Sequence, residues 1–213
     1  LDLRVAVMRD VIGDRAFGSD HQTVSTCARA YCEGLTQGGV QPMIKHMPGH
    51  GRVAVDPHDV LPSTDADMET LRNHDFRPFQ ALADVPWGMT AHVVYKAVDA
   101  ERPATQSPAV IGDIIREKLG FDGVLTSDAI DMSALSGSHP ERARLSLAAG
   151  CDVVMHCNQP LELRRAVAEA VPELEGDALR RVEAAAACKT APTPDFDRQS
   201  AMARLDNLIA KTA

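Results

Sequence analysis

Aromatic side chains, excess positive charge and long apolar runs are all scarce in this sequence. Phe, Trp and Tyr make up only 4% of the 213 residues, so the core has to be built mainly from aliphatic side chains. No apolar run approaches the ~18 residues of a membrane-spanning helix, and the chain does not open on a signal-peptide pattern. The net charge is −8 and the 22 Lys and Arg are scattered. We therefore expect neither a nucleic-acid nor a membrane partner.

The sequence also lacks a cysteine pattern for disulfides or zinc. Its five cysteines are odd in number, and no two of them are spaced as CxxC: Cys27, Cys32, Cys151, Cys157 and Cys188. We expect them to be buried, reduced thiols of a cytoplasmic protein. Apolar residues at 45% and charged residues at 24% are typical of a globular protein with a sizeable core.

Short apolar runs alternate with amphipathic helical patterns along the chain. Ser107 is a suitable helix N-cap before Pro108, and Gly120 ends a stripe formed by Ile111, Ile114, Ile115 and Leu119. Strands are predicted over 40–44, 87–90, 123–126 and 151–157, and helices over 24–35, 67–83, 107–119, 140–149 and from about 160. The helix over 67–83 is expected to be interrupted or restarted near Pro78. This order predicts an α/β fold with a parallel sheet, in which ligand sites lie at the carboxyl ends of strands.

The chain divides near residue 190. Residues 190–195 contain Pro192 and Pro194 and are the one plausible linker. Beyond the linker, Met202, Leu205, Leu208 and Ile209 indicate a helix that packs on the outside. We therefore predict a main domain over 1–190 and a C-terminal helical tail over 191–213.

The densest polar cluster is the segment Lys45-His46-Met47-Pro48-Gly49-His50-Gly51, followed by Asp56-Pro57-His58. Its Gly and Pro residues predict a shaped loop directly after a strand. A carboxylate that hydrogen-bonds one imidazole nitrogen raises the basicity of the other, so Asp56 and His58 can form a general acid/base pair.

Two other interpretations of this loop remain open. The side chains can be ordinary loop polars that cap turns. They can also bind a metal through His46, His50, Asp56 and His58, although the spacing matches no zinc pattern and Lys45 would repel a cation. We favour acid/base chemistry without a metal.

A second candidate is Asp128, which an apolar strand delivers at its carboxyl end. A barrel enzyme places a nucleophile at such a position. Asp128 or Ser127 can equally cap the next element, or Asp131 can be the cap while Asp128 does the chemistry. The segment 13–18, which contains Arg15, by itself favours a surface turn.

Together these segments resemble the bacterial β-N-acetylhexosaminidases of glycoside hydrolase family 3. The resemblance rests on the 45–51 and 56–58 loop, and extends to 12–17, 90–95, 127–128 and 149–152. It implies a (β/α)8 TIM-type barrel and a retaining hydrolysis of N-acetylglucosaminides without a cofactor or metal. It further implies Asp128 as nucleophile, His58 as acid/base with Asp56 as its partner, and Lys45, His46 and Arg15 as ligands of the sugar hydroxyls.

The resemblance also implies a small carbohydrate substrate, a muropeptide of peptidoglycan recycling, acted on by a cytoplasmic monomer. A neutral His58 would repel an incoming phosphate less than a carboxylate would, so phosphorolysis of N-acetylglucosaminides is an alternative activity. A truncated, inactive sugar-binding remnant is another alternative.

Two departures from the family pattern affect these expectations. Pro57 stands where a small residue is more usual, and it restricts Asp56 to extended conformations. The segment Leu1-Asp2-Leu3 matches the family's third strand, whereas a full barrel takes ~250 residues. We therefore expect a barrel that lacks its first two to three strands, with sheet edges open to aggregation or pairing.

Overall fold

The computed structural model describes residues 1–5, 12–53, 61–192 and 196–210. Its elements follow one another in the order η1 (Gly13–Arg15), α1 (His21–Gln37), β1 (Met43–Met47), β2 (Ser63–Thr64), α2 (Met68–Thr70), η2 (Leu71–Asp75), α3 (Arg77–Ala81), β3 (Trp87–Thr90), β4 (Val94–Tyr95), η3 (Ala104–Gln106), η4 (Val110–Lys118), β5 (Val124–Ala129), α4 (His139–Ala149), β6 (Val153–Met155), α5 (Leu161–Ala170), α6 (Gly176–Ala187) and α7 (Arg198–Ile209).

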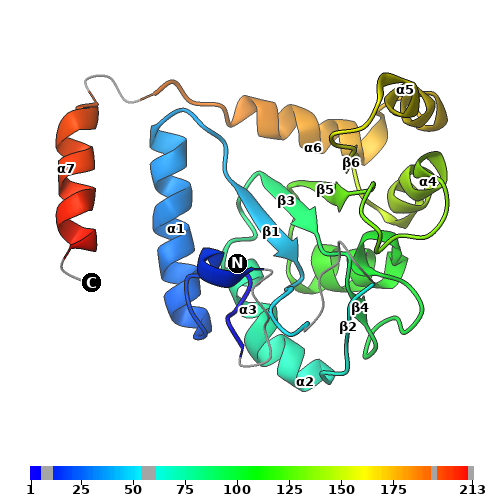
Figure 1. Ribbon diagram of the computed structural model, residues 1–213, viewed down its shortest axis with the longest axis horizontal. Helices are drawn as coiled ribbons and strands as arrows, with labels where there is room; N and C mark the ends of the chain where they lie inside the picture. The colour runs from blue at the N-terminus through cyan, green and yellow to red at the C-terminus, as the bar shows by residue number, and fades with distance from the viewer. Residues whose placement is uncertain (6–11, 54–60, 193–195, 211–213) are drawn as a thin grey trace.

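The centre of the fold is a parallel four-stranded sheet in the order β1-β3-β5-β6 (Figure 1). Met43 pairs with Trp87, and Trp87 pairs with Val124, so the first three strands start in register. The predicted α/β class and parallel sheet are thereby confirmed. In the part of the chain that the structure describes, these strands form an open sheet with β1 and β6 at its edges.

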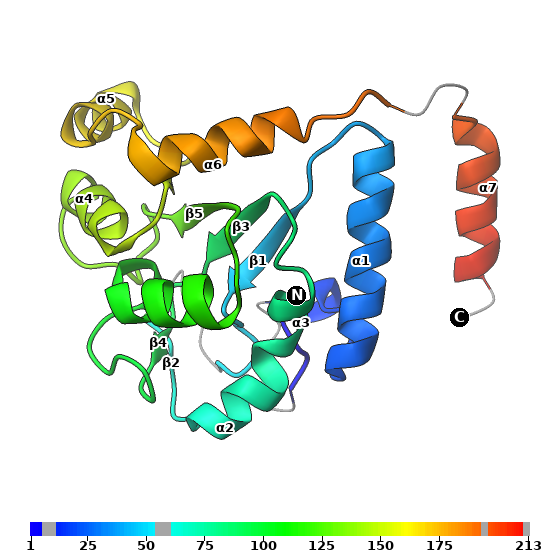
Figure 2. The same cartoon turned by 180° about the vertical axis from the view of Figure 1, so that it is seen from behind.

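Helices η4 and α3 cover one face of the sheet, with α1 alongside (Figure 2). The predicted stripe on η4 is buried, and Ser107 Oγ accepts a hydrogen bond from Val110 N at 3.2 Å, as expected of an N-cap. The main core joins these helices to β1 and β5 and includes Ile44, Met47, Phe79, Ile111, Ile115, Phe121 and Leu125. Burial of this aliphatic surface is the main source of stability.

The predicted helical segment over 67–83, with its interruption near Pro78, is confirmed, although the interruption begins earlier than expected. It consists of α2, η2 and α3, because Phe76 N bonds to Leu71 O, five residues back, and widens the turn. The predicted strand over 40–44 is displaced toward the carboxyl side in β1, since Pro42 cannot donate to the sheet. The small β2–β4 sheet was not predicted.

Helix α6 crosses the amino ends of the strands, where it is held by ion pairs. Asp152, 6% exposed, accepts from Arg116 at 2.7 Å and from Arg181 at 2.9 Å, and also from Leu125 N at 2.8 Å. The guanidinium groups and the backbone amide compensate for the cost of burying this carboxylate. The amino ends of the strands are therefore closed by structural contacts, and the opposite ends carry the polar side chains considered below.

The tail helix α7 forms, but it is not packed as expected. It lies on the far side of α1 from the sheet (Figures 1 and 2), and none of its described residues is buried. Met202, Leu205, Leu208 and Ile209 are all exposed. The apolar pattern thus predicted the helix correctly but not a burial of its face.

The cysteines follow the prediction only in part. All five are free thiols, and Cys32 and Cys151 are buried. Cys27 and Cys188 are exposed. Cys27 lies on the outer face of helix α1, and Cys188 lies at the end of α6. Burial raises the pKa of the Cys151 thiol to about 12, so this residue stays protonated in the core.

Candidate active site

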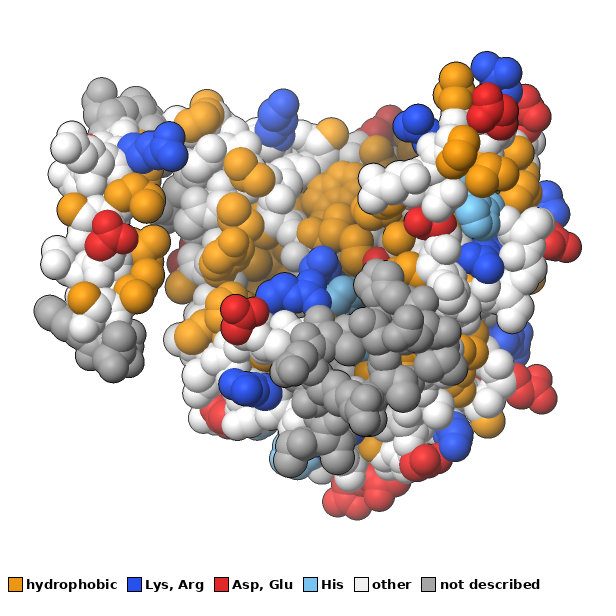
Figure 3. Space-filling model, viewed as in Figure 1, with side chains coloured by type: hydrophobic (Ala, Val, Ile, Leu, Met, Phe, Trp, Pro, Cys, Tyr) orange, Lys and Arg blue, Asp and Glu red, His pale blue; other side chains and the backbone are white. Residues whose placement is uncertain are grey.

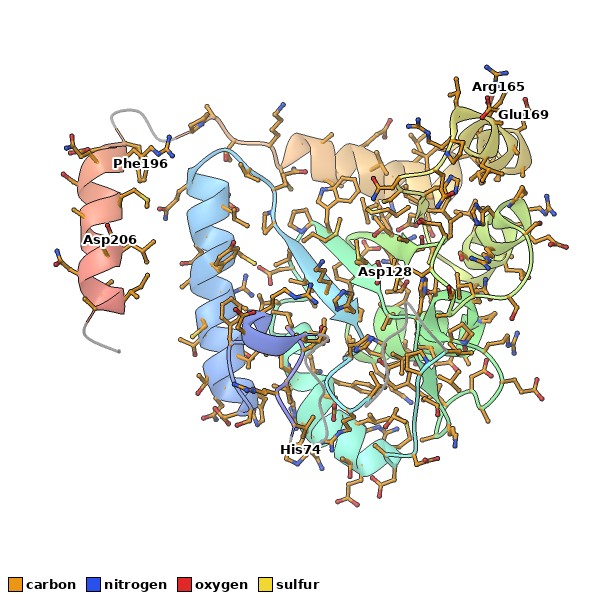
Figure 4. All side chains as sticks on the ribbon, viewed as in Figure 1. His74, Asp128, Arg165, Glu169, Phe196 and Asp206 are labelled. Atoms are coloured by element: carbon orange, nitrogen blue, oxygen red, sulfur yellow. The ribbon has the colours of Figure 1, made fainter. Side chains whose placement is uncertain are left out.

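The carboxyl ends of β1 and β5 bring His46 and Asp128 together. Figure 4 shows Asp128 at the end of β5, next to the end of β1. His46 Nε2 lies 3.8 Å from Asp128 Oδ2. Parallel strands end at the same edge of a sheet, so these two residues meet although they are far apart in the sequence.

Asp128 lies in an irregular part of β5. The β5–β6 ladder shifts register between Thr126 and Ala129, and Asp128 Oδ1 accepts a hydrogen bond from Ala129 N at 2.8 Å. Its side chain is 20% exposed, so one carboxylate oxygen is held while the group remains accessible. This is the arrangement that a nucleophile requires.

His46 is held by a buried carboxylate, that of Asp2. His46 Nδ1 lies 2.7 Å from Asp2 Oδ2, and Asp2 also accepts from the backbone N–H groups of His46 at 3.2 Å and His50 at 2.6 Å. Because an ionised carboxylate only accepts, Nδ1 carries a proton and Nε2 is turned toward Asp128. Burial would raise the pKa of Asp2, but the charge attraction and hydrogen bond of His46 outweigh it and hold that pKa well below its ordinary value.

The loop after β1 is held from several sides. Tyr95 Oη donates to Gly49 O at 2.5 Å, and Tyr95 is buried. The His50 ring lies 5.5 Å from the His46 ring, and burial lowers the pKa of His50, which favours its neutral form. These contacts hold the loop against the end of β1, the strand that carries His46.

Gly51 allows this loop to approach the first residues of the chain. A Cβ built at Gly51 would lie 2.0 Å from Leu3 O, which is backbone and cannot move aside cheaply. We expect Gly51→Ala to lower the free energy of unfolding by about 1–3 kcal/mol, measured by urea denaturation. Gly34→Ala is the matched control, since a Cβ there meets nothing within 4 Å in the exposed face of α1. It should raise stability by about 0.5–1 kcal/mol, and equal effects of both variants would contradict the argument.

Lys45 and Arg15 lie together, and Lys45 directly precedes His46 in β1. Both are exposed and line a cavity of about 420 Å³ with the aromatic side chains of Phe17 and Tyr31. Arg15 Nε donates to Ile12 O at 3.3 Å within a short 3₁₀ turn, so the expected surface turn over 13–18 is present. Figure 3 shows the face between α1 and α6 hollowed, with hydrophobic side chains bordered by Lys or Arg and by His.

Asp56 and His58 lie outside the described residues, so their predicted pairing stays a prediction. The alternative role of Asp131 as a helix cap is wrong. Asp131 Oδ1 accepts from Cys157 N at 3.2 Å, while α4 is capped by Ser138 and Glu141. In the described ranges, no three His, Cys, Asp or Glu side chains are grouped so that they could hold a metal ion.

Sequence reasoning missed Asp2 and His92. Asp2 is flanked by two leucines in a strand-like segment, which is a signal of a buried carboxylate that needs partners. His92 follows β3 and is 1% exposed. It lay within a segment that carried the family resemblance, but no pattern in that segment specified a role for it.

Comparison with known proteins decides the family. Residues 2–187 match the model of the glycosyl hydrolase family 3 N terminal domain. The chain belongs to glycoside hydrolase family 3. Within this family it is 42% identical over 205 residues to a protein of Chromobacterium violaceum named beta-hexosaminidase, covering 91% of this chain and 57% of that protein.

Solved structures of the same family share its fold. NagZ from Neisseria gonorrhoeae, in complex with N-trifluoroacetyl-D-glucosamine, superposes with a TM-score of 0.78 at 33% identity, covering 96% of this chain and 57% of that one. A family 3 β-N-acetylglucosaminidase from Paenibacillus sp. gives 0.79 at 30% identity, covering 88% and 38%. The chain thus has the TIM-barrel-type fold of family 3 and spans little more than half the length of the Chromobacterium and Neisseria relatives. None of its described helices is long and apolar enough to cross a membrane.

Proposed function

We propose that this chain carries the catalytic centre of a retaining β-N-acetylglucosaminidase. The observation that carries the proposal is Asp128, accessible at the end of β5 and turned toward a histidine that a buried carboxylate orients. Membership of family 3, and likeness to proteins named beta-hexosaminidase, supply the reaction class.

In the first step, Asp128 attacks the anomeric carbon and forms a glycosyl ester. The glycosidic bond breaks, and His58 gives a proton to the leaving oxygen. In the second step, His58, assisted by Asp56, takes a proton from water, which attacks the same carbon and releases Asp128. Two inversions retain the β configuration, and Lys45, His46 and Arg15 hold the sugar hydroxyls.

The natural substrate that we propose is a cytoplasmic muropeptide with a non-reducing terminal N-acetylglucosamine. The complex of Neisseria NagZ with an N-acylated glucosamine supports the sugar specificity at the level of the relative. We propose a monomer that needs no cofactor or metal, and a main domain over 1–190 with a tail over 191–213.

The test is release of 4-nitrophenol from 4-nitrophenyl N-acetyl-β-D-glucosaminide. The full chain should release it, with N-acetylglucosamine of retained β configuration by NMR. A chain that is folded by circular dichroism but releases nothing, or that forms the α product, would overturn the proposal.

A histidine acid/base favours a second candidate, phosphorolysis. A neutral imidazole repels an incoming anion less than a carboxylate does, so phosphate can replace water in the second step. Product analysis with and without inorganic phosphate distinguishes N-acetylglucosamine from its 1-phosphate. Phosphate-dependent formation of the 1-phosphate would favour the phosphorylase.

His58→Ala should affect the two steps differently. A 4-nitrophenolate leaving group needs little protonation, so a rapid burst of 4-nitrophenol should remain, followed by turnover slower by about 10²–10⁴-fold. Stopped-flow absorbance measures both phases. Full turnover on an unactivated N-acetylglucosaminide would contradict the acid/base role.

A further inference from the structure

His92 bridges two strands where their backbones no longer pair. The β3–β5 ladder ends at Met89 and Thr126, while β5 continues to Ala129. His92 Nε2 lies 3.0 Å from Ala129 O, across this gap. The imidazole thus supplies a connection that the ladder itself no longer makes.

The surroundings of His92 determine where its proton lies. A carbonyl oxygen only accepts, so Nε2 carries the hydrogen that binds Ala129 O. Burial lowers the pKa of His92, which keeps the ring neutral, so Nδ1 accepts from Thr105 Oγ1 at 2.8 Å. Thr105 Oγ1 in turn accepts from Thr90 Oγ1 at 2.8 Å. Ala91 O lies 3.1 Å from Thr105 Oγ1 as a competing acceptor for the single hydroxyl proton. With that proton on the His92 side, the two hydroxyls and the imidazole form one buried hydrogen-bonded chain that ends at Ala129 O.

Ala129 transmits this restraint to the nucleophile. The N–H of Ala129 donates a hydrogen bond to Asp128 Oδ1 at 2.8 Å, while the carbonyl of Ala129 accepts a hydrogen bond from His92 Nε2. On the other side, Ile130 N donates to Met155 O at 2.9 Å. Because the β5–β6 register is irregular at Asp128, these contacts, and not regular sheet pairing, set the direction of the Asp128 side chain.

We propose that His92 is a positioning residue that fixes the attack direction of Asp128 through the Ala129 carbonyl. The proposal rests on the proposed function, because it concerns the same nucleophile. It assigns no contact with substrate to His92. The predicted effect is therefore on the formation of the covalent bond, and not on the binding of the sugar.

Two substitutions separate positioning from simple packing. His92→Gln can place an amide N–H near the Nε2 position, whereas His92→Asn reaches only the Nδ1 position. We expect Asn to lower kcat/KM for the nitrophenyl glycoside by about 100-fold, with an unchanged inhibition constant for N-acetylglucosamine, and Gln to restore activity to within about 5-fold of wild type.

Cys151→Ala is the matched control for buried packing. Cys151 is buried and its Sγ donates to the backbone carbonyl of Thr105 at 3.7 Å, so it borders the same network but makes none of the contacts that join His92, Ala129 and Asp128. The Cys151→Ala variant should have a lower free energy of unfolding, with little change in kcat/KM of the folded fraction. Equal losses in Gln and Asn, or a loss in Cys151→Ala as large as in His92→Asn, would overturn the proposal.

A measurement without activity keeps the proposal separate from the proposed function. ¹⁵N NMR of histidine-labelled full chain should show His92 as the neutral Nε2–H tautomer, protected from solvent exchange, with the signal assigned by its loss in His92→Gln. An Nδ1–H tautomer would overturn the proposal even in an active protein. Lack of hydrolysis with the expected tautomer would instead overturn the proposed function and leave the His92 contact established.

Discussion

Asp128→Ala should abolish hydrolysis, lowering kcat/KM by about 10⁴-fold or more. The variant has no carboxylate to form the glycosyl ester, and the neighbouring His46 cannot replace it. Because Asp128 is partly exposed and its hydrogen bond is to the adjacent Ala129, we expect the free energy of unfolding to change by less than about 1 kcal/mol. Release of 4-nitrophenol and urea denaturation measure the two effects.

The chain offers a matched control for Asp128 three residues along. Asp131 is held by Cys157 N and Gln159 Nε2, so Asp131→Ala removes a nearby carboxylate without removing the nucleophile. It should retain most of the activity. Added azide should restore 4-nitrophenol release to Asp128→Ala only, by attacking the anomeric carbon from the vacated side to give the α-glycosyl azide. Wild-type turnover in Asp128→Ala would exclude its assignment as the nucleophile.

Asp2→Ala should have the largest effect on stability, lowering the free energy of unfolding by about 3–5 kcal/mol. The change removes the acceptor of the buried N–H groups of His46 and His50 and of the His46 ring. Each donor left unsatisfied in the interior is costly. Activity should fall as well, even under conditions in which the variant remains folded, because His46 loses the group that orients its ring.

The contribution of Asp2 to stability should depend on pH in one direction. The folded pKa of Asp2 lies below the ordinary value of about 3.9, so the unfolded chain takes up a proton first as pH falls. The stabilisation is complete at neutral pH and is lost below about pH 4. The difference in free energy of unfolding between wild type and Asp2→Asn should therefore narrow from pH 5 to pH 3. A difference that grows over this range would contradict the ionised Asp2.

Local patterns predicted most of the elements of this fold. β3 begins and ends at the predicted residues, and Gly150 ends α4 in a left-handed conformation with a φ of 115°, as expected of a helix-ending glycine. Boundaries failed where a contact outside the pattern decided them. The Phe76–Leu71 hydrogen bond widened the helix after Thr70, and β1 continues to Met47 because Met47 pairs with Thr90 of β3.

Local residue patterns were enough to predict the α/β class, the loop after β1 and the position of Asp128 at the end of an apolar strand. These features follow from periodicity, capping and turn chemistry, which act over a few residues. Two contacts become visible only in the folded chain: Asp2 orients His46 from 44 positions away, and His92 reaches Ala129 from 37 positions away. Such pairings depend on which strands become neighbours and on how buried donors and acceptors satisfy one another, and neither leaves a periodic trace in the chain.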